Sequence, residues 1–511
     1  MLCFFGRRRR LRDLCDSNRT VFIITRSWYY ATDSLNPNII KHFRFHQRRR
    51  KKRRKMAKPQ EEEASTSTSS SSLTISNLTN PISKPKPTPK RFIHTQIPSS
   101  LLSDPALNAA ISLLPSSYDF EVHKTLHRIT TSSAKRVALQ LPDGLLMFSL
   151  PLADILSSFA PSNPSILILA DPTYGACCLA DTAAASLSAD LLVHYGHSCL
   201  VPVTSSLLPV LYVFVDIRVD ASRLAESVRN TFPDPSTPIA LAGTIQFVSA
   251  VHSAREILMS NGYDQIHVPQ AKPLSPGEVL GCTAPTIPKS KNVEAVVFVA
   301  DGRFHLEAFM IANPKIKAFR YDPFLGVLVL EEYDHDGMKK ARKDAILEAR
   351  KAKNWGIILG TLGRQGSVKV LDRVLEHMEE KGFDYTIVLM SEISPQRIEL
   401  FGNSIDAWVQ IACPRLSIDW GEGFKRPMLT TFEFDVAMGY VKGWWEKNLG
   451  SCQTSGCVGC DCGDVNQEYP MDYYSQDGGE WNSCYMKKKA ASGERNKAVR
   501  RLGVQNVQLK Q

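Results

Sequence analysis

Three cysteines each follow a short apolar run that is typical of a buried strand. Cys177 follows the run ILILAD, Cys282 follows QIHVPQ, and Cys413 follows AWVQIA, so the three are widely separated in the sequence. In open α/β sheets, ligands bind outside the carboxyl ends of the strands. Three such ends facing one another would bring three thiolates to one point. Thiolates hold iron–sulfur clusters, and three of them on a four-iron cluster leave one iron open to a substrate.

Two other interpretations of these cysteines remain open at this point. A zinc ion can also take three cysteines, although structural zinc sites usually draw their ligands in close sequence pairs. A lone cysteine is more often a small buried hydrophobe than a ligand. We assign Cys178 and Cys199 to this last class.

The apolar runs predict the elements that must position these cysteines. Each run is continuous and rich in β-branched residues, which is typical of parallel strands covered on both faces. Helical segments, such as 336–353 and 368–381, fall between them. Strands that alternate with helices predict a doubly wound α/β fold. The expected strands are 137–142, 166–171, 191–196, 210–217, 239–243, 295–301, 355–360, 385–390 and 407–412.

The strands fall into three groups of similar size, from which we predict three α/β domains. A chain of 511 residues is too long for one ordinary core. Its 43% apolar and 22% charged residues are those of a soluble globular protein. No apolar run reaches about 18 residues, so no transmembrane helix and no membrane partner is expected. The expected domains are 92–207, 208–320 and 321–446, between a disordered tail at 1–91 and a flexible cysteine-containing tail at 447–511.

The basic excess of the chain lies at its beginning. The net charge is +11, but residues 1–55 hold 17 of the 62 Lys and Arg and only three of the 51 Asp and Glu, so the remainder is slightly acidic. The globular part therefore gives no support to nucleic-acid binding. The basic segment could be an organelle transit peptide, a nuclear-type basic tract or an extension ahead of a start at Met56, and we favour the extension. Residues 57–90 are rich in Ser, Thr, Pro and Lys and are expected to be disordered.

A second group of cysteines lies near the C-terminus in the pattern C-x4-C-x2-C-x-C. A CxxC pair with further cysteines nearby is a fair metal signal. One interpretation is a metal or redox-relay site that passes electrons to the main cluster. The other is a flexible tail whose thiols bind metal adventitiously. The residues are Cys452, Cys457, Cys460 and Cys462.

Nine strings, in order, resemble the diphthamide-biosynthesis family. The resemblance covers about residues 92–446 and is far more specific than any single motif. No CxxxCxxC motif is present, so the chain does not resemble the usual radical-SAM enzymes. The strings are VALQLPDGLLMF, ADPTYGACC, ADLLVHYGHSCL, LYVFVDI, LGCTAP, DGRFHLEAFMIANP, YDPF, WGIILGTLGRQGS and VQIACPRLSIDWG.

The resemblance implies a fold, a cofactor and an activity. The family fold is three similar α/β domains in a pseudo-threefold arrangement, and each domain gives one cysteine to a [4Fe–4S] cluster. Mapped by motif, the ligands here are Cys177, Cys282 and Cys413, with Cys178 adjacent to the first. S-adenosylmethionine binds the open iron, and its reductive cleavage yields a 3-amino-3-carboxypropyl radical. The radical adds to a histidine of elongation factor 2, so the chain is expected to be a cytoplasmic transferase.

The resemblance also implies partners. The eukaryotic enzyme of this family is a heterodimer of two related subunits, and the second lacks the full cysteine set. All three ligand positions are occupied here, which indicates the catalytic subunit. Elongation factor 2 is the protein substrate. A small iron protein with its own reductase supplies the electrons.

Several polar residues near strand ends are candidates for holding S-adenosylmethionine. The string GTLGRQG follows a strand, where a glycine-rich turn lets backbone N–H groups approach a ligand. An arginine there could bind the methionine carboxylate bidentately, although an ordinary tight turn is about as plausible. The string lacks both the GxGxxG spacing and a Walker lysine, which disfavours nucleotide hydrolysis. The candidates are Gly360, Thr361, Gly363, Arg364 and Gln365 here, with Gln140 and Asp143 after the first strand.

Other polar residues near strand ends have a structural alternative. His194 and His197 could order a substrate, although a structural histidine is the commoner outcome. Arg415 could compensate the charge of the cluster, or form a buried ion pair with Asp419. We name no acid or base catalyst.

Three functions compete on these grounds. The radical transferase explains both the cysteines and the nine strings. A noncatalytic iron–sulfur electron-transfer or metal-binding module explains the cysteines, but it would neither bind nor cleave S-adenosylmethionine. A nucleic-acid-binding protein is suggested only by the basic segment 48–55.

Overall fold

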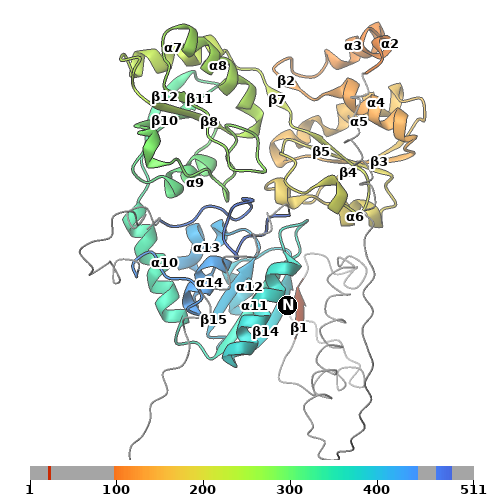
Figure 1. Cartoon of the computed structure of the whole chain (residues 1–511). Helices are drawn as coiled ribbons and strands as arrows, with labels where there is room; N and C mark the ends of the chain where they lie inside the picture. Colours follow the sequence, from red (N-terminus) through yellow and green to blue (C-terminus); the bar gives the residue numbers. More distant parts are fainter. Residues whose placement is uncertain (1–20, 25–96, 447–467, 486–511) are drawn as a thin grey trace, which may run out of the picture.

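The computed structural model describes residues 21–24, 97–446 and 468–485. Figure 1 shows three lobes coloured orange to yellow, green, and cyan to blue, and each lobe holds one main sheet. The described residues therefore form an α/β protein with parallel sheets, as the sequence predicts. No helix in the described ranges is long and apolar enough to cross a membrane.

The first sheet has the order β4-β3-β5-β6 and is entirely parallel. Its strands are β3 (Arg136–Gln140), β4 (Ser165–Leu169), β5 (Leu191–Tyr195) and β6 (Val210–Val213). Beside it lies the small antiparallel pair of β2 (Tyr118–Asp119) and β7 (Asp216–Ile217). Its helices are α2 (Ser99–Leu102), α3 (Pro105–Ile111), α4 (Val122–Ser132), α5 (Ser149–Phe159) and α6 (Asp181–Ser186).

The second sheet has the order β12-β11-β10-β8-β9. Its last strand, β12, runs antiparallel to β11, which the sequence did not predict. The strands are β8 (Ile239–Gly243), β9 (Ile266–His267), β10 (Ala295–Val299), β11 (Lys317–Asp322) and β12 (Val327–Glu331). The helices are α7 (Ala221–Thr231), α8 (Val248–Ser260) and α9 (Phe304–Ala312).

The third sheet has the order β1-β14-β13-β15-β16 and is parallel throughout. Its strands are β1 (Val21–Ile24), β13 (Asn354–Gly360), β14 (Asp384–Met390), β15 (Ala407–Ile411) and β16 (Met428–Leu429). Its helices are α10 (His335–Ala349), α11 (Val368–Lys381), α12 (Pro395–Glu399), α13 (Arg415–Trp420) and α14 (Thr431–Ala437).

Two strands lie in a different sheet from the one that the expected boundaries give them. The boundary after residue 207 placed the run 210–217 in the second domain, but β6 pairs with β5 in the first sheet. The boundary after residue 320 placed residues 321–331 in the third domain, but β12 pairs with β11 in the second. Sheet pairing overrides sequence grouping here, because each of these strands completes an edge.

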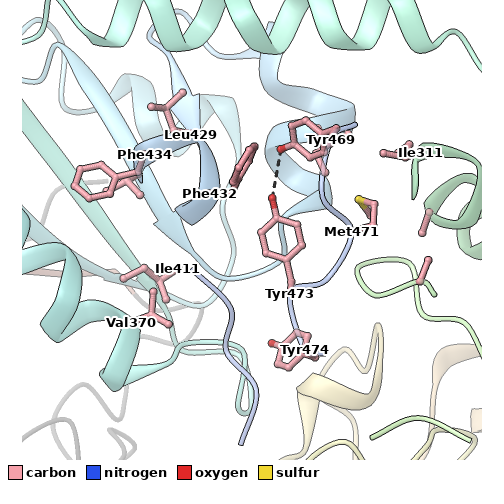
Figure 2. Close-up of a cluster of buried hydrophobic side chains, with 14 of the residues drawn as sticks. Ile311, Val370, Ile411, Leu429, Phe432, Phe434, Tyr469, Met471, Tyr473 and Tyr474 are labelled. Carbon is pink, nitrogen blue, oxygen red and sulfur yellow. Dashed lines mark hydrogen bonds between the residues drawn. The ribbon is translucent and has the colours of Figure 1, made fainter. Parts of the chain in front are cut away.

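The segment 468–485 corrects the expectation of a flexible tail from residue 447. Tyr469, Tyr473 and Tyr474 are buried in the largest core, together with residues of the second and third lobes. Figure 2 shows Tyr469 and Tyr473 joined by a hydrogen bond, with Phe432 beside them. We call residues 468–485 the strap.

A buried ion pair ties the strap to the third lobe. Arg342 of α10 donates two hydrogen bonds to Glu433 of α14, at 2.6 and 2.7 Å, and both side chains are almost fully buried. Glu433 also accepts from the Tyr469 hydroxyl at 2.9 Å and from the Thr430 backbone at 2.8 Å. Because both charges are paired and hydrogen-bonded, the strap, α10 and α14 form one connected unit.

Candidate functional site

The structure places the three expected cysteines in three different lobes. Cys177 lies in a one-turn 3-10 helix (Ala176–Cys178) beyond β4, Cys282 in the turn before β10, and Cys413 two residues past the end of β15. Each is partly buried, and none forms a disulfide. Cys177 and Cys413 therefore follow strand ends as the sequence predicts, whereas Cys282 lies in the turn between Leu280 and Thr283, well beyond β9.

Electrostatics indicate that these thiols lie near one another. The pKa of Cys177 is raised by a hydrogen bond with Cys178, by burial, and by the charges of Cys282 and Cys413. Burial and Cys413 raise the pKa of Cys282 to about 12, and burial raises that of Cys413 to about 11. Three thiolates gathered in a buried place repel one another unless a positive centre binds them. The donor set therefore fits a metal cofactor.

The arrangement suits a cluster better than a single ion. In the parts of the chain that the structure describes, no three His, Cys, Asp or Glu side chains are placed to hold one metal ion. A tetrahedral zinc needs its sulfurs within about 2.3 Å of one atom. In a four-iron cluster each thiolate binds a different iron, so the sulfurs stand further apart.

The two cysteines that we assigned to burial differ from each other. Cys178 is buried, as expected, with 1% of its surface exposed. Cys199 is exposed, so its assignment as a buried hydrophobe is wrong. It lies just beyond β5 in the loop 196–200, between the buried residues Ser198 and Leu200.

The glycine-rich turn after β13 packs against the first cysteine rather than standing open. Gly363 has φ +54°, and a Cβ on it would lie 2.4 Å from the carbonyl carbon of Cys178. The next backbone N–H, of Arg364, donates to the Cys177 carbonyl at 2.8 Å. The amide Nε2 of Gln365 lies 3.5 Å from the Cys178 Sγ. This turn therefore fixes the first cysteine against the third lobe.

The other two candidates of this turn belong to the strand end. Gly360 is the last residue of β13 and is buried, and a Cβ on it would lie 2.8 Å from the Ala412 Cβ. The Thr361 N–H donates to the Met390 carbonyl at 2.9 Å. Both residues hold β13 close to its neighbouring strands. The contact of Gly360 is with Ala412, the residue before Cys413.

Arg364 has an internal partner. Its Nε donates to Asp181 at 2.8 Å, and its Nη2 forms a second bond to the same carboxylate. Asp181 is fully buried at the start of α6, in the first lobe. The guanidinium fork that we expected to bind a methionine carboxylate thus binds a protein carboxylate and joins two lobes.

Arg415 forms the ion pair with Asp419 that the sequence offered as one of two roles, the other being compensation of the charge of a cluster. Its Nε donates to Asp419 at 2.8 Å, and it also pairs with Glu307 of α9. Its Nη1 donates to the Phe304 carbonyl at 2.7 Å. These contacts connect the segment after Cys413 with the second lobe. They also place a cation near Cys413 and Cys282, whose pKa values it lowers.

The side chain of Gln140 holds the backbone just after Cys177 through hydrogen bonds. Its Nε2 donates to the Cys178 carbonyl at 2.8 Å, and its Oε1 accepts from the Ala180 N–H at 3.0 Å and faces His194 Nδ1 at 2.8 Å. Every polar atom of this fully buried side chain is thereby used within the protein. Asp143, in contrast, is exposed at the start of the 3-10 helix Asp143–Phe148.

The sequence analysis missed the strap as part of the site. The Tyr474 N–H donates to the hydroxyl of Thr283, next to Cys282, at 3.0 Å. The pKa of Tyr474 is raised by burial and by the charges of Cys177, Cys282 and Cys413. The signal that could have found it is the string YPMDYY, which is strongly aromatic within a polar stretch.

The fold and the site together define an α/β protein whose three lobes bring three cysteines to one place. The chain belongs to the family described as "Putative diphthamide synthesis protein", whose sequence profile matches residues 141–449.

The matches to two named relatives span most of this chain and most of each relative. The chain is 48% identical over 396 residues to 2-(3-amino-3-carboxypropyl)histidine synthase subunit 1 of Bos taurus, covering 77% of this chain and 84% of that protein. It is 49% identical over 389 residues to the protein of the same name from Homo sapiens, covering 76% and 82%.

A solved structure shares the fold. Dph2 from Pyrococcus horikoshii is 25% identical, with a TM-score of 0.53, and the match covers 63% of this chain and 92% of that one. The same protein has also been solved with a 4Fe-4S cluster. The family resemblance found in the sequence is therefore confirmed.

Proposed function

We propose that this chain is the catalytic subunit for the first step of diphthamide biosynthesis. It transfers a 3-amino-3-carboxypropyl group from S-adenosylmethionine to a histidine of elongation factor 2. The observation that carries the proposal is the gathering of Cys177, Cys282 and Cys413 from three lobes, in a chain whose relatives bear the name of this synthase.

The three cysteines would hold a [4Fe–4S] cluster, one thiolate to each of three irons. When bound, such a cluster supplies electrons for cleaving S-adenosylmethionine to the aminocarboxypropyl radical, and its fourth iron is open to that substrate. The relative of known structure that contains a 4Fe-4S cluster supports this assignment. We further propose that the three lobes are three similar domains in a pseudo-threefold arrangement around the cysteines.

The protein's own residues have positioning roles in this proposal. Gln140 and the Gly363 turn fix the backbone of the first cysteine from two sides. Arg415 places a positive charge beside the second and third cysteines, which favours their thiolate form. The strap covers the site with Tyr474, and a covered site keeps water from a radical.

The proposal includes a sister subunit, a small iron protein with its reductase as electron donor, and a cytoplasmic location where elongation factor 2 is met. An apolar patch supports the need for a protein partner. The hairpin of β11 and β12 exposes five large apolar side chains at a sheet edge, and such patches mark interaction surfaces. They are Phe324, Leu325, Val327, Val329 and Leu330.

The test is anaerobic and uses intact-mass spectrometry. The chain is co-expressed with its sister subunit, reconstituted with iron and sulfide, reduced with dithionite, and mixed with S-adenosylmethionine and unmodified elongation factor 2. We expect the factor to gain one 3-amino-3-carboxypropyl group, and the Cys413→Ala variant to give none. An unmodified factor beside an intact cluster would favour a noncatalytic iron–sulfur carrier instead.

A further inference from the structure

Six buried polar atoms between the first two lobes have no hydrogen-bond partner. They come from the end of β5 and the loop after it, from the loop and one-turn 3-10 helix (Ile245–Phe247) after β8, and from the segment before Cys282. A buried polar atom that stays unsatisfied destabilises the folded state, so a group of them in one place indicates a missing partner. The atoms are His194 Nε2, His197 Nδ1, Ser198 Oγ, Thr244 Oγ1, Gln246 Oε1 and Glu278 Oε1. We call these residues the polar cluster.

Contacts around the polar cluster link its members into a continuous chain. The ring centroids of His194 and His197 lie 5.3 Å apart. Burial raises the pKa of the Glu278 carboxyl, and the nearby Ser198 hydroxyl offsets part of that rise. The backbone of Glu278 forms an isolated parallel β-bridge with Gly243, the residue before Thr244. Gln246 closes the chain, because its Nε2 donates to the Gly196 carbonyl of the first loop at 3.2 Å.

The polar cluster adjoins the cysteine site through two backbone segments. Gln140 contacts both His194 and the carbonyl of Cys178, at 2.8 Å each. On the other side, Glu278 lies four residues before Cys282 in the same tight segment, where Leu280 and Thr283 exchange backbone hydrogen bonds. A ligand at the polar cluster would therefore lie beside the cysteines.

The hydrogen bonds of Gln140 determine where the proton of His194 lies. Ala180 N–H can only donate and the Cys178 carbonyl can only accept, which fixes the orientation of the Gln140 amide. Its Oε1 must then accept from His194 Nδ1, so that nitrogen carries the proton. The ring is deeply buried beside His197 and stays neutral, and its Nε2 is consequently a bare acceptor.

Two further atoms of the polar cluster are acceptors by the same reasoning. Because the Gln246 Nε2 donates to the Gly196 carbonyl, its unpartnered Oε1 is an acceptor. Glu278 is fully buried, and one of its oxygens accepts from the Ser275 N–H at 2.9 Å. No cationic side chain in the described ranges pairs with it. A buried carboxylate without a cation is costly unless a ligand provides one.

We propose that the polar cluster binds a primary ammonium group, with His194 Nε2, Gln246 Oε1 and Glu278 Oε1 as its acceptors. An ammonium has three N–H donors and one positive charge, which match three unpartnered acceptors and one unpaired carboxylate. This inference rests on the proposed function, in which the small substrate is S-adenosylmethionine. The group held would be the α-ammonium of its methionine end, beside the cysteines.

The test compares two ligands by isothermal titration calorimetry. The full chain, purified anaerobically with its cluster, is titrated with S-adenosylmethionine and with the analogue that has a hydroxyl in place of the α-ammonium. Wild type should bind the ammonium compound about tenfold to a hundredfold more tightly, as expected for charge-assisted hydrogen bonds. Glu278→Gln should lose most of this preference. Glu256→Gln, an exposed carboxylate of α8, is the matched control and should keep it.

Further readouts separate binding from folding. Without ligand, Glu278→Gln should melt no lower than wild type, because it removes an unpaired buried charge. If that variant does not fold, Gln246→Met gives the same test at a partly exposed position, with an expected loss of about fivefold. An unchanged ligand preference in the variants would overturn the ammonium site and leave the proposed function standing. A wild-type chain that binds neither compound would overturn both.

Discussion

Replacing Gly363 by alanine should detach the third lobe from the first cysteine. The new Cβ would lie 2.4–2.6 Å from three backbone atoms of Cys178, and backbone cannot move aside cheaply. The left-handed φ of +54° adds about 1–2 kcal/mol for a residue with a Cβ. Overpacking adds about 1–3 kcal/mol, and loss of the hydrogen bond from Arg364 to Cys177 about 1 kcal/mol. The sum is about 3–6 kcal/mol.

The matched control is Gly402→Ala. Gly402 has nearly the same φ, +57°, but a Cβ there would meet nothing within 4 Å. It should cost only the conformational part, about 1–2 kcal/mol, and keep the cluster. The assay is urea unfolding together with the iron content of the anaerobically purified chain. Equal losses of stability in the two variants, with iron retained in both, would refute the close approach of the turn to Cys178.

Three further changes test other parts of the site. Glu433→Gln leaves Arg342 as a buried unpaired cation and should cost about 3–5 kcal/mol in urea unfolding, whereas the exposed Glu399→Gln should cost under about 1 kcal/mol; similar values for the two would contradict the buried pair. Tyr474→Ala opens the cover of the site and should speed the bleaching of cluster absorbance in air, and an unchanged rate would remove the strap from the site. Gln140→Leu removes the hydrogen bond to the Cys178 carbonyl and should lower the iron content of the purified chain. A normal iron content would disprove this role of Gln140.

The sequence predicted the elements well because the signal was local. All nine apolar runs contain strands, since a strand covered on both faces must be apolar at every position. The sheet to which β6 and β12 belong could not be read in this way. Strand pairing depends on partners that are distant in sequence, and the apolar run of β12 does not show which sheet it joins or in which direction.

The candidate site was predictable only in part for the same reason. A cysteine after a strand is visible in the sequence, so the positions of Cys177 and Cys413 could be anticipated. Cys282 lies in the turn between Leu280 and Thr283, away from a strand end, and was indicated by the family string LGCTAP. The partner of Arg364 could not, because Asp181 lies in another lobe. The strap was missed because its polar composition indicates a tail, while its burial depends on the second and third lobes.

The measurement that tests the central claim most directly is the iron and sulfide content of single cysteine variants. The chain and each variant are purified anaerobically and reconstituted in the same way. We expect four irons per chain in wild type and in Cys199→Ala, whose side chain is exposed. Cys177→Ala, Cys282→Ala and Cys413→Ala should each lose the cluster or hold it in a markedly depleted form. Full iron and sulfide in any one of these three would contradict the account.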